Sequence, residues 1–255
     1  MLELIDAPGL TPALTAAIAD PDQPTPRLVL DLDVVARQYD EFVAALPGVE
    51  VFYAVKANPL PEVLRTLAER GSCFDIASIG ELELCRSLGI DPGRLSYGNT
   101  VKRSADIALA ASLGVEMFAF DSAEELSKLV TSAPGAVAFC RLTTDSIGSD
   151  WPLSKKFGTT PERATELLVR AANNGMRIGV SFHVGSQQRD LGGWVRALGK
   201  VRLVVERLAE LGLDLDVLNL GGDSRPTISS RSRRSRRSVT SSPTSSATCV
   251  PGSVG

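Results

Sequence analysis

The chain has 255 residues, a formal net charge of −3, 44% hydrophobic residues and 22% charged residues, which are values typical of a globular protein. No apolar run approaches the roughly 18 residues that a membrane-spanning helix needs, which excludes a transmembrane span. The first residues lack the basic and apolar segments of a signal peptide, so we expect a cytoplasmic protein.

Apolar runs typical of β-strands alternate with segments of helical spacing along the chain. The expected strands cover residues 27–32, 49–58, 73–78, 94–99, 116–122, 136–142, 177–186 and 215–222. The expected helices cover residues 33–46, 61–71, 80–90, 104–114, 123–133, 162–175 and 193–212. Asp121 or Ser122 is suited to begin the fifth of these helices, and Thr160 with Pro161 is suited to begin the sixth.

The order of the elements predicts an α/β fold with a parallel sheet. Seven strands follow residue 49, and they lack the polar alternation of a sheet with one wet face. Seven strand–helix steps favour a parallel barrel of the (β/α)8 type over an open sheet. No eighth strand is evident, so we expect an incomplete barrel with two unpaired edges. The strand at 27–32 precedes the barrel and is expected to pair elsewhere.

The composition divides the chain into three parts: an N-terminal extension at 1–25, a barrel domain at 26–222 and a tail at 223–255. The tail holds eleven Ser and six Arg, so it carries +5 while the rest of the chain carries −8. Its low complexity predicts disorder. Arginine-rich segments can bind nucleic acid, but no aromatic residue lies between these arginines and no linker precedes them. We therefore favour an out-of-frame translation for the tail over nucleic-acid binding.

The four cysteines do not form a metal or disulfide pattern. No two of them make a CxxC pair, and none lies beside the single histidine. We expect reduced thiols and no metal site, as in a cytoplasmic protein.

Several polar residues lie at the C-terminal ends of the predicted strands, where the reactive groups of parallel barrels lie. They are Lys56, Asp75, Asn99, Arg141, His183 and the pair Gly221 and Gly222. A lysine held there among apolar neighbours can attack a carbonyl, although it can also extend into solvent. His183 is either a core residue or a ligand-contacting group. Gly185 and Ser186 form a turn suited to an anion.

Five motifs occur in order with the spacing of a known family. They are YAVKANPLPEVLRTLAERGSCFDIASIGELE, RLSYGNTVK, CRLTTDS with SKKFG, SFHVGSQ and LNLGG. Over about residues 25–222 the sequence resembles the decarboxylases of ornithine, diaminopimelate and arginine that use pyridoxal 5′-phosphate (PLP). It is most similar to the short bacterial ornithine decarboxylases.

The resemblance implies an alanine-racemase-like barrel, PLP as cofactor, a homodimer, and decarboxylation of a basic amino acid, with L-ornithine to putrescine as the first candidate. By position it implies that Lys56 forms the Schiff base with PLP and that Asp75 and Glu81 line the active site. It places Arg141 near the cofactor ring and His183 against the ring's face. The phosphate contacts that it implies are Ser186, Gly221 and Gly222.

The sequence departs from the family pattern after Gly222. The family continues its glycine loop with Gly-Phe, whereas Asp223 and Ser224 follow here. The family's later glutamate loop and C-terminal β domain, which the strand at 27–32 would join, are not found. We therefore expect a truncated or frameshifted decarboxylase with weak or no turnover. The alternatives are a non-catalytic PLP-binding barrel and a nonfunctional truncated product.

Overall fold

The computed structural model describes residues 11–20, 22, 26, 28–145, 149–151, 156–188, 190, 192–222 and 245–249. Its α-helices are α1 (Pro12–Ala19), α2 (Leu32–Ala45), α3 (Pro61–Glu69), α4 (Ile79–Ser87), α5 (Ser104–Ser112), α6 (Ala123–Ser132), α7 (Pro161–Asn173) and α8 (Gly192–Glu210). Its strands are β1 (Glu50–Ala54), β2 (Cys73–Ile76), β3 (Leu95–Tyr97), β4 (Met117–Phe120), β5 (Val137–Leu142), β6 (Ser149–Trp151), β7 (Arg177–Phe182), β8 (Ser186–Gln188), β9 (Val217–Asn219) and β10 (Ser245–Cys249). Two 3₁₀ turns are η1 (Val55–Ala57) and η2 (Pro92–Arg94).

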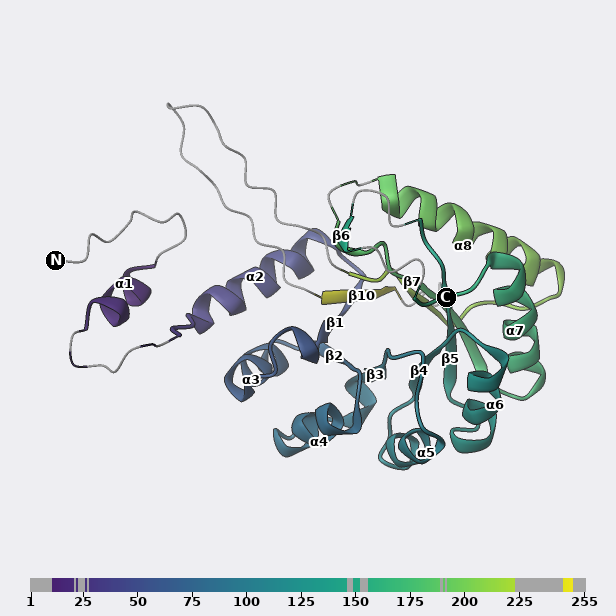
Figure 1. Cartoon of the computed structure of the whole chain (residues 1–255), viewed down its shortest axis with the longest axis horizontal. Helices are drawn as coiled ribbons and strands as arrows, with labels where there is room; N and C mark the ends of the chain where they lie inside the picture. The colour runs from purple at the N-terminus through teal and green to yellow at the C-terminus, as the bar shows by residue number, and fades with distance from the viewer. Residues whose placement is uncertain are drawn as a thin grey trace.

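The barrel contains the seven parallel strands that the sequence predicts. Neighbouring strands pair in the order β1, β2, β3, β4, β5, β7 and β9, each parallel to the next. Helices α3 to α8 lie around the outside of these strands, while α1 and α2 extend to one side (Figure 1). The α/β class and the parallel barrel are therefore confirmed.

The eighth position of the barrel is filled by β10, which corrects the expectation of two unpaired edges. This strand runs antiparallel to β1 on one side and to β9 on the other, and the barrel is closed. The prediction that the whole tail is disordered is therefore wrong at residues 245–249, which form a strand. Extended backbone of almost any composition can supply the hydrogen bonds between strands. The rest of the tail, including its arginines, lies outside the described residues.

A second correction concerns the strand expected at residues 27–32. Residues 28–31 have no regular structure, and α2 begins at Leu32. Leu28 is 89% exposed, so its apolar side chain has no sheet to pack against in the described part of the molecule. Asp31 instead begins the helix, since its carboxylate accepts hydrogen bonds from the amides of Asp33 and Val34.

Short polar side chains fix where the outer helices start. Ser78, Ser122 and Thr160 each accept a hydrogen bond from the backbone amide three residues later, at 3.3, 3.1 and 3.3 Å. The last two confirm the predicted helix starts. Each helix then buries its apolar face against the strands, and the largest fully buried side chains come from the strands: Phe52, Phe74, Phe118, Phe120 and Phe182.

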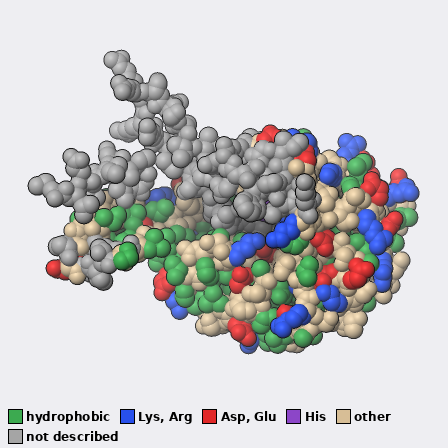
Figure 2. All heavy atoms as spheres, viewed as in Figure 1, with side chains coloured by type: hydrophobic (Ala, Val, Ile, Leu, Met, Phe, Trp, Pro, Cys, Tyr) green, Lys and Arg blue, Asp and Glu red, His purple; other side chains and the backbone are tan. Residues whose placement is uncertain are grey.

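The surface and the cysteines agree with a globular barrel. Acidic and basic side chains are interspersed over the visible face of the outer helices (Figure 2). Cys73, Cys85 and Cys140 are free and buried. Among the described helices, none combines the length and the apolar character needed to cross a membrane.

Candidate active site

The carboxyl end of the barrel gathers most of the polar residues expected there. Lys56 lies on η1, directly after β1, and its side chain is exposed. The strand thus ends four residues earlier than predicted, and the amine is open to solvent instead of being enclosed by apolar neighbours. An open amine at this position is reachable by a carbonyl compound.

Asp75, on the neighbouring strand β2, is the acid closest in the barrel order to Lys56. Its Oδ1 atom is buried and makes no hydrogen bond of ordinary geometry. The same is true of the hydroxyl oxygen of Ser96, which stands opposite Asp75 in the register of β2 and β3. Burial raises the pKa of Asp75 to about 6, against the charge of Lys56, which lowers it. The Ser96 hydroxyl nevertheless lowers the pKa of Asp75, so the two polar groups lie close together at the barrel mouth.

Glu81 has a structural contact that the sequence does not reveal. Its carboxylate accepts a hydrogen bond of 2.6 Å from the amide of Ala77, while its own amide donates to Ser78. This reciprocal arrangement holds the start of α4 against the end of β2. Glu81 also raises the pKa of Asp75 through its negative charge, so it belongs to the electrostatic surroundings of that acid.

Arg141, near the end of β5, is held between an aromatic ring and two acids. Its guanidinium lies 5.2 Å from the centre of the Phe157 ring. Burial lowers the pKa of Arg141, and the charges of Asp121 and Asp75 oppose that effect. Asp121, which follows β4, accepts a hydrogen bond of 2.8 Å from the amide of Gly158. Arg141 therefore links β5 electrostatically to the acid on β2 and to the acid that follows β4.

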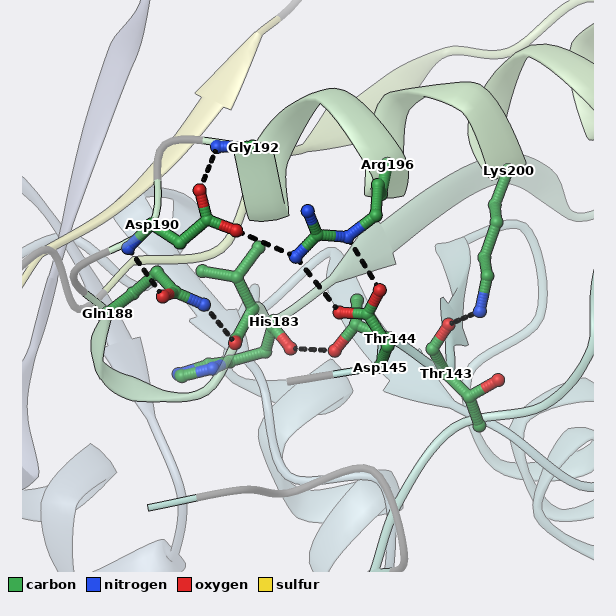
Figure 3. Close-up of polar contacts among 10 residues, drawn as sticks. Thr143, Thr144, Asp145, His183, Gln188, Asp190, Gly192, Arg196 and Lys200 are labelled. Carbon is green, nitrogen blue, oxygen red and sulfur yellow. Dashed lines mark hydrogen bonds and ion pairs between the residues drawn. The ribbon is translucent and has the colours of Figure 1, made fainter. Parts of the chain in front are cut away.

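His183 follows β7, and its backbone and ring are both fixed. Thr144, after β5, donates its hydroxyl to the His183 carbonyl at 2.7 Å (Figure 3). The amide of Gly185 donates to Nδ1 of the His183 ring at 3.0 Å. Because Nδ1 accepts, a neutral ring carries its proton on Nε2.

A second set of contacts ties the loops after β5 and β7 to α8. Arg196 on α8 contacts Asp145 at 2.6 Å and Asp190 at 2.9 Å (Figure 3). Lys200, one turn later, donates to the Thr143 carbonyl at 2.8 Å. These contacts keep the Thr144–His183 pair in place from outside the barrel.

The glycine turn after β9 packs against the loop of His183. Gly221 has φ +70°, and a Cβ atom there would lie 2.3 Å from the carbonyl oxygen of Phe182. Its amide donates to the side chain of Asn219 at 2.9 Å. Gly222 follows it, partly buried. Only glycine allows this turn to approach the end of β7 so closely.

The structure thus brings the predicted residues to one end of the barrel, although not all of them into direct contact. Ser186 begins β8, which pairs with β6 in a separate two-stranded sheet. Asn99 lies in the loop after β3 and bonds mainly within that loop. Asp121 and Thr144 were missed as site residues, although both follow predicted strands and the same positional rule would have found them. Ser96 lies inside a short buried strand, so the sequence carries no signal for its role.

A family model described as the pyridoxal-binding domain of pyridoxal-dependent decarboxylases matches residues 32–235. The lysine/ornithine decarboxylase of Selenomonas ruminantium is 39% identical over 200 residues, covering 78% of this chain and 51% of that protein. Antizyme inhibitor 2 of Xenopus laevis is 41% identical over 206 residues, covering 80% of this chain and 45% of that protein. The chain therefore spans about half the length of these curated relatives.

Solved structures of decarboxylases resemble this chain in fold as well as in sequence. A mutant of the decarboxylase SrLDC in complex with PLP superposes with a TM-score of 0.79 at 37% identity, covering 85% of this chain and 56% of the other. The lysine/ornithine decarboxylase of Vibrio vulnificus, complexed with putrescine, gives a TM-score of 0.75 at 35% identity, covering 85% and 57%.

Proposed function

We propose a reaction for this chain on the premise that it belongs to the family of pyridoxal-dependent decarboxylases, of which it contains the pyridoxal-binding domain. The proposal is that Lys56 attaches PLP and that the site acts on a basic amino acid, with L-ornithine to putrescine as the leading reaction. Ornithine comes first because relatives that match are named for it, while others are named for lysine and arginine.

The residues at the barrel mouth fit PLP. The aldehyde of PLP needs an accessible amine, which the exposed Lys56 supplies. An orphaned carboxylate oxygen on Asp75 can accept a hydrogen bond from a protonated group on the ligand. The family resemblance puts the phosphate at the turn after β9, where Gly221 packs against the carbonyl of Phe182 and Gly222 follows it at the same end of the barrel.

Each protein group then has a defined task. When bound, PLP supplies a conjugated ring that accepts the electron pair left behind as CO₂ departs. With a pKa of about 6, Asp75 is ionised at neutral pH, so its carboxylate can accept a proton there. The carboxylate also lies close enough to Lys56 for the two charges to interact. Ordered by Thr144 and Gly185, the His183 ring offers a flat surface on which the ring of PLP can stack. Arg141 balances the negative charge of Asp75 and Asp121.

The observation that carries the proposal is the exposed Lys56 near the partly buried Asp75, at the end of the barrel where the glycine turn after β9 also lies. To test the proposal, PLP is added to the full chain and any imine that it forms with a lysine is reduced with borohydride. The labelled lysine is then identified by mass spectrometry. Label on Lys56, and loss of the visible absorbance of bound pyridoxal in Lys56→Ala, are expected. Lys200→Ala is the matched control, since that amine contacts a carbonyl on the same side of the barrel. Label spread evenly over surface lysines contradicts the proposal.

We further infer that turnover by this chain alone is weak. It spans about half the length of its relatives, and Asp223 stands where the family pattern has a third glycine. Carbon dioxide release from ornithine, lysine and arginine, measured in parallel, ranks the substrates. Release from ornithine at the rate of a full-length relative contradicts impairment.

The frameshift remains a proposal about residues 223–255. Its support is the abrupt change to Ser- and Arg-rich sequence after Gly222, although the family match itself continues to residue 235. Reading the source DNA in all three frames tests it. The expected result is a family-like continuation after a Gly-Gly-Gly-Phe motif in another frame, and its absence contradicts the idea.

A second candidate is a barrel that binds PLP without decarboxylating an amino acid. The match to a protein named antizyme inhibitor favours it, because a name of that kind describes inhibition, not an enzyme's reaction. Binding of PLP at Lys56 with no CO₂ release from any basic amino acid is the result expected for this candidate. A homodimer is also proposed from the family resemblance, and light scattering of the full chain tests it.

A further inference from the structure

Lys102 is a buried cation that the proposed reaction does not use. It belongs to the YGNTVK motif and lies in the loop between β3 and α5. Its side chain is 0% exposed, in contrast to the exposed Lys56. Burying an ammonium group is costly unless several hydrogen-bond acceptors replace its water, so we expect such acceptors around Lys102.

Three acceptors surround the Lys102 ammonium, one from each of three segments. It donates to the carbonyl of Asn99 at 2.8 Å and to the carbonyl of Ala119, in β4, at 2.5 Å. It also lies 2.9 Å from Oε1 of Glu125 on α6. The single ammonium therefore joins its own loop to the end of β4 and to the first turn of α6.

Glu125 completes the network on the side of α6. Its side chain is 4% exposed, and its second oxygen contacts Lys128, whose ammonium also donates to the carbonyl of Lys102. Burial lowers the pKa of Lys102 to about 8, and Glu125 opposes that effect. The other charges that act on Lys102 are those of Lys128 and Asp121. The loop is thus held through both its side chain and its backbone.

The other end of this loop lies on Asp75. Gly98 is so close that a Cβ atom there would lie 2.2 Å from Oδ1 of Asp75. The Gly98 amide donates to the carbonyl of Ile76 at 3.0 Å, which keeps the loop on β2. Asn99, whose carbonyl Lys102 holds, is the next residue. The backbone that shields Asp75 from water is therefore the same backbone that Lys102 fixes.

We propose that Lys102 is a positioning residue, whose ammonium holds the segment 98–102 over Oδ1 of Asp75 and so shields that oxygen, on the carboxylate near Lys56, from water. The inference rests on the proposed function only in taking Lys56 and Asp75 as parts of the site. The raised pKa of Asp75 agrees with it, because burial is the leading cause. The charges that face Asp75 are those of Lys56, Glu81 and Arg141.

The decisive variant removes the buried pair together: Lys102→Met with Glu125→Leu in the full chain. Removing both partners keeps the net charge and replaces the pair by apolar groups of similar size, which folded proteins tolerate better than one unpaired charge. Any change at Asp75 then reports the position of the loop. The titration of Asp75 is followed by ¹³C NMR of its carboxyl carbon without cofactor, and Asp75→Asn assigns the signal.

The expected result is a lower titration midpoint for Asp75, by about one pH unit, as water reaches the carboxylate. The control variant Arg103→Met with Asp106→Leu removes the ion pair next along the chain, in which Arg103 is 81% exposed, and should leave the midpoint unchanged. An unchanged midpoint in the folded Lys102 variant, even with a lower melting temperature, overturns the proposal, because a purely structural pair would change stability alone.

A second measurement applies if the double variant does not fold. Lys102→Gln keeps a hydrogen-bonding side chain but cannot satisfy all three acceptors. Faster hydrogen exchange of the Gly98 amide is expected relative to wild type, and unchanged exchange overturns the proposal. Neither measurement needs PLP, so a failure of PLP binding at Lys56 would contradict the proposed function and leave this inference standing.

Discussion

At the scale of single residues, Asp75 combines the clearest electrostatic perturbation with a position next to the attaching lysine. Its pKa is raised by burial, so the folded state binds a proton more tightly than the unfolded chain does. Between the ordinary value of 3.8 and the folded value of about 6, the folded protein therefore loses stability as the pH rises. Above this window the full cost of the buried carboxylate is present.

Replacing Asp75 with asparagine should remove that cost. The Asp75→Asn variant is expected to exceed wild type in unfolding free energy at pH 8 by about 1–3 kcal/mol, and to match it near pH 4. Urea denaturation at the two pH values measures the difference. Asp106→Asn is the control, because that carboxylate is paired with the exposed Arg103 and its pKa is lowered, not raised. A stability gain for Asp75→Asn that is equal at both pH values would show that the charge is not its cause.

The residue scale also shows what the sequence could and could not supply. Lys56, Asp75, Arg141 and His183 were found because each follows a recognisable strand and the motif spacing is specific. Lys102 and Ser96 could not be assigned, because the importance of each depends on a neighbour that is distant in sequence. The Ser-x-x-Glu spacing predicts that Glu81 accepts from the amide of Ser78, whereas its carboxylate accepts from the amide of Ala77, so the sequence does not reveal that contact.

At the scale of the elements, the turn after β9 depends on backbone geometry more than on chemistry. Gly221 and Gly212 both have φ +70°, yet only Gly221 would bring a Cβ atom within 4 Å of another segment. The two positions therefore separate the cost of the left-handed backbone from the cost of the close approach to β7.

Alanine at Gly212 should cost about 1–2 kcal/mol of unfolding free energy from backbone strain alone. Alanine at Gly221 should cost that amount and about 1–3 kcal/mol more, since the turn must move away from Phe182. Urea denaturation of the two variants measures the costs, and PLP affinity should fall only in Gly221→Ala. Equal destabilisation by the two changes would show that the close approach is not restrictive.

The elements also show why strand prediction failed at residues 28–31. The run RLVLDL has the apolar pattern of a strand, but a strand forms only where another strand offers its backbone. In the described part of the molecule none lies beside it, and Leu28 stays exposed. The seven barrel strands were predicted because each has both a partner strand and a covering helix, so local pattern and tertiary context agree.

At the scale of the whole molecule, closure of the barrel depends on a strand far along the chain. β10 pairs with β1 through Glu50–Tyr53 and with β9 through Leu218 and Asn219. This pairing could not be predicted, because residues 245–249 lack the apolar pattern of a buried parallel strand. Backbone hydrogen bonding, which every non-proline residue can provide, supplies the interaction instead.

Deleting residues 223–255 should therefore expose the edges of β1 and β9 and cause self-association. Light scattering after size-exclusion chromatography is expected to show larger species for this variant than for the full chain. Removal of residues 250–255 alone leaves β10 in place and serves as the control. A deletion variant that elutes with the same mass and melting temperature as the full chain would show that β10 does not protect the barrel.

The pairing of β1 with β10 also sets the order of events during synthesis. β1 leaves the ribosome well before β10, so its ladder partner on that side arrives only after the other barrel strands have been made. Throughout that interval the nascent barrel presents an open hydrogen-bonding ladder, to which a chaperone that recognises extended backbone could bind.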